Sequence, residues 1–103
     1  MDAQRDVFEE IRAREQLAQR REVEHKQHAL DLYNVMRTEE GRRLMYHILK
    51  DCGTDALSFH TNALTMAFNE GKRAIGVTLV EQLRQACNDF YLTMLEEQSG
   101  EHQ

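Results

Sequence analysis

Residues 38–53 read TEEGRRLMYHILKDCG and carry the signals for both ends of one helix. Thr38 can cap the first turn, because its hydroxyl can accept a hydrogen bond from a backbone N–H that has no partner within the helix. The two glutamates that follow place negative charge at the positive end of the helix dipole. Gly53 can take the left-handed backbone conformation that ends many helices. The stretch therefore predicts a helix of roughly four turns over residues 39–52.

Apolar residues in this predicted helix recur three and four positions apart, which indicates one continuous inward face. They are Leu44, Met45, Ile48, Leu49 and Cys52. The charged residues of the same helix are expected to face water. They are Arg42, Arg43, Lys50 and Asp51.

The segment before this helix is dominated by strong helix formers and predicts one long helix over about residues 3–36. Between residues 12 and 28 the apolar side chains are too few for a core-facing stripe, so this part should project into solvent. We expect an N-terminal helical arm over residues 1–30 and a compact helical body over residues 31–98.

The start of the arm carries three apolar residues, Val7, Phe8 and Ile11, which we call the arm tip. A solvated helix of this length is hard to sustain alone. The arm tip should therefore either fold back on the body or sit in the groove of a partner, as amphipathic helices do.

A connector follows the central helix, and Leu57 and Phe59 within it are expected to turn inward. A short helix near residues 62–68 could come next. Thr61 or Asn62 would cap it, because both side chains can accept a backbone hydrogen bond.

Asn69 is suited to cap a final long helix over residues 70–98, and residues 99–103 are expected to form a flexible tail. One face of this helix is apolar, at Ile75, Leu79, Leu83, Ala86, Phe90 and Met94. A second apolar strip predicts packing on two sides, through Val77, Val80, Cys87, Tyr91 and Leu95. The fold class is therefore all-α, with three main helices at about residues 3–36, 39–52 and 70–98.

The chain has 103 residues, no proline, no tryptophan and a formal net charge of -5. This length allows one domain with a modest core. The negative charge argues against nucleic acid as a partner, because phosphate binding needs a dense cationic face. No signal peptide and no apolar stretch of the ~20 residues that a membrane helix needs is present, so we expect a cytoplasmic protein without a membrane partner. The two cysteines lack the spacing of a metal or redox pair.

No arrangement of side chains in the sequence indicates catalysis. His25 and His28 share a helix face, but no third metal ligand accompanies them. His47 and His60 have no nucleophile or carboxylate in a recognisable arrangement beside them. Phosphate-binding, dinucleotide-binding and hydrolase motifs are absent as well. We therefore expect no enzyme activity, no metal and no cofactor.

Residues 39–68 also have the outline of a helix-turn-helix reader of DNA. The recognition segment would be residues 56–68, which contain no Arg or Lys, so base reading would rest on a few polar side chains. The alternative function is accordingly a small cytoplasmic regulator that binds DNA or a host protein through this corner.

Two short motifs resemble a known family when they are taken together. The first is Thr38-Glu39-Glu40-Gly41-Arg42-Arg43, and the second is Phe68-Asn69-Glu70-Gly71-Lys72-Arg73. In this order they resemble the helix starts TxEGRR and FxxGxR of the Bbp-nineteen-like phage domain family, which short-tailed phages encode among their portal, scaffold and capsid genes. The resemblance covers residues 32 to about 96 and leaves the arm outside.

The resemblance implies a non-enzymatic virion or assembly protein that binds other phage structural proteins. Its expected place is the portal or the head-to-tail region of the particle, in multiple copies that also associate with one another. Localisation would be the virion and, during assembly, the host cytoplasm.

Gly41 and Gly71 each fall about two residues into a predicted helix start, which suggests that another backbone packs close to each of them. The two helix starts would then approach one another or a partner and gather four cations in a basic corner. These are Arg42, Arg43, Lys72 and Arg73. If these cations are ordinary surface charges, neighbouring glutamates should form ion pairs with them. As a docking patch they would meet an acidic protein surface. The arm tip and the basic corner are the predicted partner-binding sites.

Overall fold

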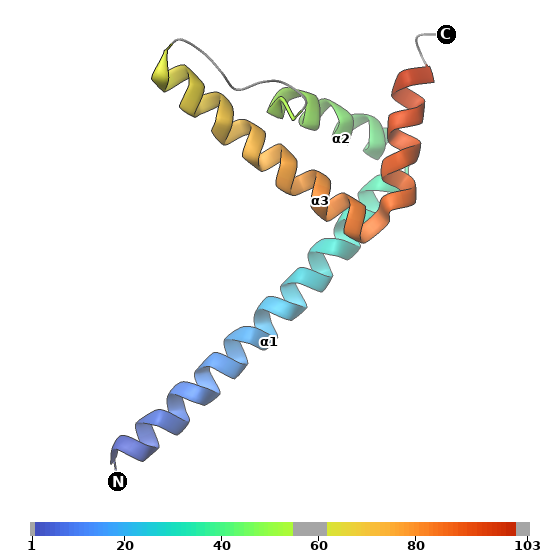
Figure 1. Cartoon of the computed structure of the whole chain (residues 1–103). Coiled ribbons are helices and arrows are strands. Elements are labelled where there is room, and N and C mark those ends of the chain that lie inside the picture. Colours follow the sequence, from blue (N-terminus) through green and yellow to red (C-terminus); the bar gives the residue numbers. More distant parts are fainter. Residues whose placement is uncertain (1, 55–61, 101–103) are drawn as a thin grey trace.

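The computed structural model describes residues 2–54 and 62–100, and these residues form three helices and no strand. Helix α1 spans Asp2–Met36, α2 spans Glu39–Cys52 and α3 spans Ala63–Gly100 (Figure 1). The predicted all-α fold with a long N-terminal helix is confirmed. Leu57, Phe59 and Thr61 lie outside the described residues.

Both predicted ends of α2 are confirmed. The Thr38 hydroxyl accepts a hydrogen bond from the backbone N–H of Gly41 at 3.0 Å, as an N-cap side chain does. Gly53 has φ 67° and ψ 40°, and its N–H donates to the carbonyl of Lys50 at 3.0 Å. This left-handed conformation is one that glycine adopts without a side-chain penalty, so it ends the helix at Cys52.

The start of α3 differs from the prediction. Asn62 caps the helix, because its Oδ1 accepts hydrogen bonds from the N–H groups of Leu64 at 2.9 Å and Thr65 at 3.1 Å. Asn69 lies inside the helix, so the predicted cap there is wrong, and the short helix near 62–68 is the first part of α3. Asparagine and glycine weaken a helix interior by about 1 kcal/mol or less each, which neighbouring turns can absorb.

Helix α3 bends sharply at Cys87, where φ is -158° and ψ is 59° (Figure 1). We call residues 88–100, which follow the bend, the terminal segment. Leu83 before the bend and Met94 after it are both fully buried. The bend therefore lets two parts of one helix cover the core from different directions.

The core lies where the end of α1 meets α2 and the bent part of α3. Its buried side chains are Leu32, Met36, Met45, Leu49, Leu83, Cys87 and Met94. α2 lies beside the first part of α3 and runs in the opposite direction (Figure 1). All three helices thus contribute to one small apolar cluster.

Several side chains predicted to face inward are exposed. Leu44 is 61% exposed, Ile75 is 66% exposed, and Ile48 is also exposed. Successive residues of a helix are about 100° apart around its axis, so Leu44 points well away from the buried Met45. α2 is covered on one side only, and apolar residues beside its buried stripe stay in contact with solvent.

Two glycines allow close contacts between elements. A Cβ atom at Gly41 would collide with the backbone carbonyl of Val35, so the expected close backbone approach is found at the end of α1. A Cβ at Gly71 would have no other described residue of this chain within 4 Å, so the close approach of the two helix starts to one another is not found. Gly76 is buried, and a Cβ there would lie 2.7 Å from Cβ of Cys52. Gly76 therefore sets the spacing between α3 and the end of α2.

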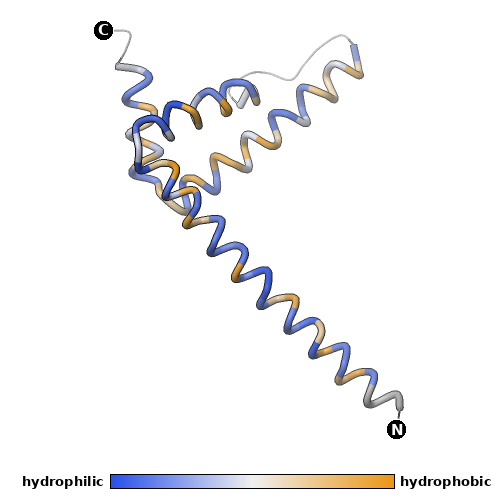
Figure 2. The backbone as a smooth tube through the Cα atoms, turned by 180° about the vertical axis from the view of Figure 1, so that it is seen from behind, coloured by the Kyte–Doolittle hydropathy of each residue, from blue (hydrophilic) through white to orange (hydrophobic). Residues whose placement is uncertain are grey.

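The molecule is long and thin, with principal extents of 72 × 40 × 15 Å. Its radius of gyration is 19.8 Å, whereas a compact domain of this length has a radius of gyration of about 13 Å. The difference comes mainly from α1, which runs away from the other helices with few hydrophobic positions along its length (Figure 2). A chain of this shape leaves an unusually large share of its surface uncovered.

Candidate functional site

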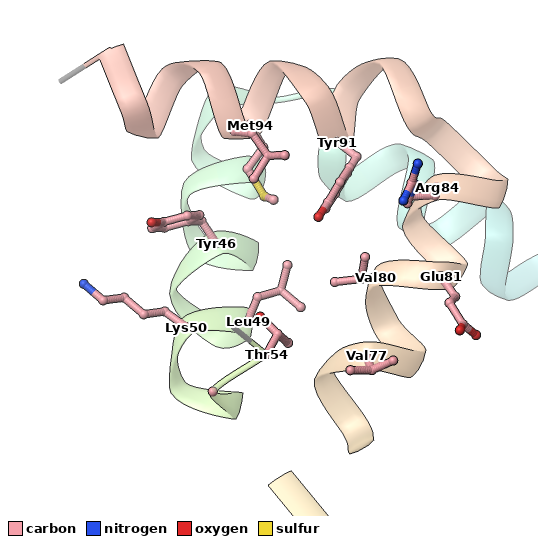
Figure 3. Close-up of a pocket in the computed structure, with 12 residues that line it drawn as sticks. Tyr46, Leu49, Lys50, Thr54, Val77, Val80, Glu81, Arg84, Tyr91 and Met94 are labelled. Atoms are coloured by element: carbon pink, nitrogen blue, oxygen red, sulfur yellow. The ribbon is translucent and has the colours of Figure 1, made fainter. Parts of the chain in front are cut away.

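A groove of about 500 Å³ lies between α2 and the two parts of α3 that meet at the bend. Its floor is apolar, and Leu49, Val80 and Met94 come from three different stretches of helix (Figure 3). Tyr91 of the terminal segment points into the same space. Because the groove depends on the bend at Cys87, sequence periodicity alone did not predict it.

Charged side chains stand at the rim of the groove. Lys50 comes from the last turn of α2, and Glu81 and Arg84 come from α3 (Figure 3). Lys50 and Arg84 are exposed, and neither forms an ion pair with another described residue. An apolar floor with two available cations suits an apolar anchor that is flanked by carboxylates.

Arg42 has a structural role that the sequence did not reveal. Its Nε donates to Oε1 of Glu97 at 2.7 Å, and its Nη2 donates to Oε2 at 3.1 Å. Nη1 donates to the carbonyl of Met36 at 3.0 Å, and the guanidinium lies 5.9 Å from the ring centroid of Phe90. The side chain is only 12% exposed, so the prediction that Arg42 faces water is wrong. It joins the end of α1 to the terminal segment.

The ion pair shifts the ionisation of both partners. The hydrogen bond with Glu97 raises the pKa of Arg42, and the hydrogen bond from Arg42 lowers the pKa of Glu97. Each shift favours the charged form of its group. The bidentate geometry is the arrangement in which an arginine–carboxylate pair is strongest.

The other three cations of the predicted basic corner are placed differently. Arg43 pairs with Glu39 at 3.6 Å and Arg73 pairs with Glu70 at 3.5 Å, both on the surface. Lys72 lies 5.1 Å from the ring centroid of Phe68. Arg43 and Arg73 therefore pair with neighbouring glutamates, as ordinary surface charges do.

The structure does not gather the four cations at one place. Arg42 and Arg43 lie in the first turns of α2. Lys72 and Arg73 lie about one turn before Gly76, which contacts Cys52 at the opposite end of α2. A helix of this length spans about 20 Å, so the predicted basic corner is not formed.

The arm tip is exposed in the structure. Phe8 is 61% exposed, and Val7 and Ile11 are exposed as well. Every residue from 6 to 28 is exposed, and Ala29 is the first half-buried one. The arm tip therefore does not fold back on the body, and its binding to a partner stays a prediction.

His28 has a structural contact, and Cys87 is buried. Nε2 of His28 lies 3.1 Å from Oε1 of Gln82, which links α1 to α3. Burial raises the pKa of the Cys87 thiol, which keeps it protonated and weakly reactive. Within residues 2–54 and 62–100, no three His, Cys, Asp or Glu side chains come together as metal ligands would. His60 lies outside this range.

The helix-turn-helix outline is not preserved as two short helices. The described part of the expected recognition segment is the first two turns of the long α3. Residues 62–68 there contain no Arg or Lys, and residues 55–61 are not described. In the part of the chain that is described, no helix is long and apolar enough to cross a membrane.

Comparison with known proteins gives one finding. The family model described as Bbp19-like phage protein matches residues 33–96, which is more than half of the chain. The match covers the last turn of α1, all of α2 and most of α3, and it excludes the arm. No curated protein and no solved structure shows a significant match. The chain belongs to the family of Bbp19-like phage proteins.

Proposed function

We propose that this phage protein is a non-enzymatic component of the virion or of its assembly intermediates, and that it acts by binding other structural proteins. The observation that supports this proposal is the amount of apolar surface left uncovered. Among the described residues, exposed large apolar side chains outnumber the buried ones by more than two to one. Three of the exposed ones, Val7, Phe8 and Ile11, are neighbours on α1, and clusters of exposed apolar side chains mark sites of association.

The total surface area supports the same proposal. The chain exposes 8404 Å², whereas a compact protein of 12.1 kDa exposes about 6,000 Å². The excess of roughly 2,400 Å² is as large as the area buried in stable protein assemblies. A thin body with a projecting arm is therefore suited to being covered by neighbours.

The proposed location is the portal or the head-to-tail region, where the chain would be present in several copies. Rings of identical subunits offer the same neighbouring surface many times, so weak contacts through each arm add up by avidity. Membership in a phage family and the shape of the chain support this location. During assembly the protein would reside in the host cytoplasm.

Quantitative mass spectrometry of purified particles and of isolated assembly intermediates tests the proposal. We expect the chain in at least one of these fractions at a fixed ratio to the portal protein. A phage that lacks the gene should yield fewer complete particles. Absence from every fraction, together with normal particle yield from the deletion phage, would contradict the proposal.

A further inference from the structure

The arm tip cannot reach the groove of its own chain. α1 is one uninterrupted helix, and His28, whose side chain contacts Gln82 of α3, lies 17 positions after Ile11. At 1.5 Å per residue, Ile11 lies about 25 Å along the helix from that contact. Any surface that covers Val7, Phe8 and Ile11 in this conformation must belong to another molecule.

The net charges of the first turns of α1 and of the groove are opposite in sign. Residues 2–15 carry five carboxylates and three arginines, a net charge of -2, and Arg5 and Arg12 directly flank the segment of the arm tip. The groove rim carries Lys50 and Arg84, both exposed, against the single carboxylate of Glu81 among its lining residues. Surfaces of opposite net charge attract one another.

The apolar side chains of the arm tip also suit the apolar floor of the groove. The groove floor is formed by Leu49, Val80 and Met94, and its volume of about 500 Å³ can take a few large side chains. Phe8 and Ile11 are three residues apart and lie on adjacent turns of α1, which is the spacing of anchor residues when a helix docks in a groove.

We propose that the arm tip of one copy docks in the groove of a second copy of this chain. Phe8 is the main anchor, and the net negative charge of residues 2–15 is attracted to Lys50 and Arg84 of the second copy. This inference rests on the proposed role in binding and names the binding partner. If two copies exchange arms they close a dimer, and if each arm is passed to the next copy they form a ring or a chain.

A charge exchange tests the docking with purified protein. One variant carries Glu9→Lys and Glu10→Lys in the arm, and the other carries Lys50→Glu and Arg84→Glu at the groove rim. All four positions are exposed, so far-UV circular dichroism and urea unfolding should show both variants folded. Light scattering should give the wild-type chain a mass above that of the monomer. Each variant alone should be monomeric at the same concentration.

The mixture of the two variants separates this proposal from other occupants of the groove. The cationic arm of one variant matches the acidic groove of the other, so an equimolar mixture should regain a mass above the monomer. A mixture that stays monomeric, or a wild-type chain that is monomeric at every concentration, would overturn the proposal. The proposed function could survive either result, because it is tested on phage particles.

Two single substitutions in the arm provide a matched control. Phe8→Ala should raise the dissociation constant by about tenfold or more, because it removes the central anchor. Val23→Ala removes an equally exposed apolar side chain far from the arm tip, and it should change the constant by less than about twofold. Equal effects of the two substitutions would indicate association along the whole arm and would contradict docking in the groove.

Discussion

The two ends of α1 belong to one helix but differ in what holds them. Near its C-terminal end, Leu32 is buried and Met36 is 0% exposed, and both pack in the core. Near its N-terminal end, Phe8 and Val7 are exposed to solvent. The difference shows that the core includes the last turns of α1, while the arm is uncovered and is maintained by helix propensity.

Local interactions along the exposed part of α1 are weak. Lys26 and Glu22 form an ion pair of 3.2 Å, and Gln27 donates to Asp31 at 2.9 Å. Pairs of this kind contribute about 0.2–0.5 kcal/mol each to an isolated helix. The arm is therefore a helix of low intrinsic stability that grows from its packed end.

The largest expected effect is a loss of stability when a cavity is opened at the packed C-terminal end of α1. Met36→Ala should lower the free energy of unfolding by about 2–5 kcal/mol, because it opens a cavity in a small core. Phe8→Ala should change it by less than about 0.5 kcal/mol when both are measured by urea unfolding at dilution. Met36→Leu keeps most of the side-chain volume and serves as the control, with a loss below about 1.5 kcal/mol. Equal losses at Met36 and Phe8 would show that the arm belongs to the core.

The next largest effect tests the close contact between Gly41 and the last turn of α1. Gly41→Ala should lower the free energy of unfolding by about 1–3 kcal/mol, because its Cβ would collide with the carbonyl of Val35. Gly71→Ala has open space and should raise it by up to about 1 kcal/mol through helix propensity. Thermal unfolding followed by circular dichroism measures both. If Gly41→Ala raised the free energy of unfolding as Gly71→Ala is expected to do, the close approach at Gly41 would be refuted.

The sequence was sufficient to predict the elements whose ends are set by local interactions. Thr38 and Gly53 bound α2 as expected, because a cap hydrogen bond and a left-handed glycine are properties of neighbouring residues. Asn69 failed as a cap, because Asn62 offers the same side chain and starts the helix earlier. The bend at Cys87 has no proline or glycine beside it, and those are the usual sequence signals of a kink.

The candidate site was predictable only in part, because the sequence reveals local patterns but not contacts between distant residues. The arm tip stands out in the sequence as three apolar residues in a polar helix, and the structure leaves it uncovered. The partner of Arg42 could not be predicted, because Glu97 is 55 residues away and reaches it only after the bend. The groove likewise depends on that bend.

The ion pair between Arg42 and Glu97 predicts a dependence of stability on pH. The pKa of Glu97 in the folded chain is below its ordinary value near 4.5, so the contribution of the pair is complete above that pH. It is lost as the pH falls through the folded-state pKa. Glu97→Gln should cost about 1–3 kcal/mol at neutral pH, and this difference from the wild type should disappear in strong acid.

Arg43→Gln is the matched control for the ion pair, because Arg43 is the next residue and its side chain is 50% exposed. Its loss should stay below about 1 kcal/mol. Urea unfolding of both variants across the acid range makes the comparison. A cost of Glu97→Gln that is the same at neutral and at strongly acid pH would refute the role given to the charge.

Hydrogen exchange followed by mass spectrometry, on dilute and on concentrated protein, tests the contrast between the two ends of α1 most directly. In dilute solution the amides of residues 6–24 should exchange quickly, while those of residues 29–36 should be protected by the core. At high concentration the amides near the arm tip should become protected, and those of the core should not change. Arm amides that are protected to the same extent as the core at every concentration would contradict a projecting arm that docks on another copy.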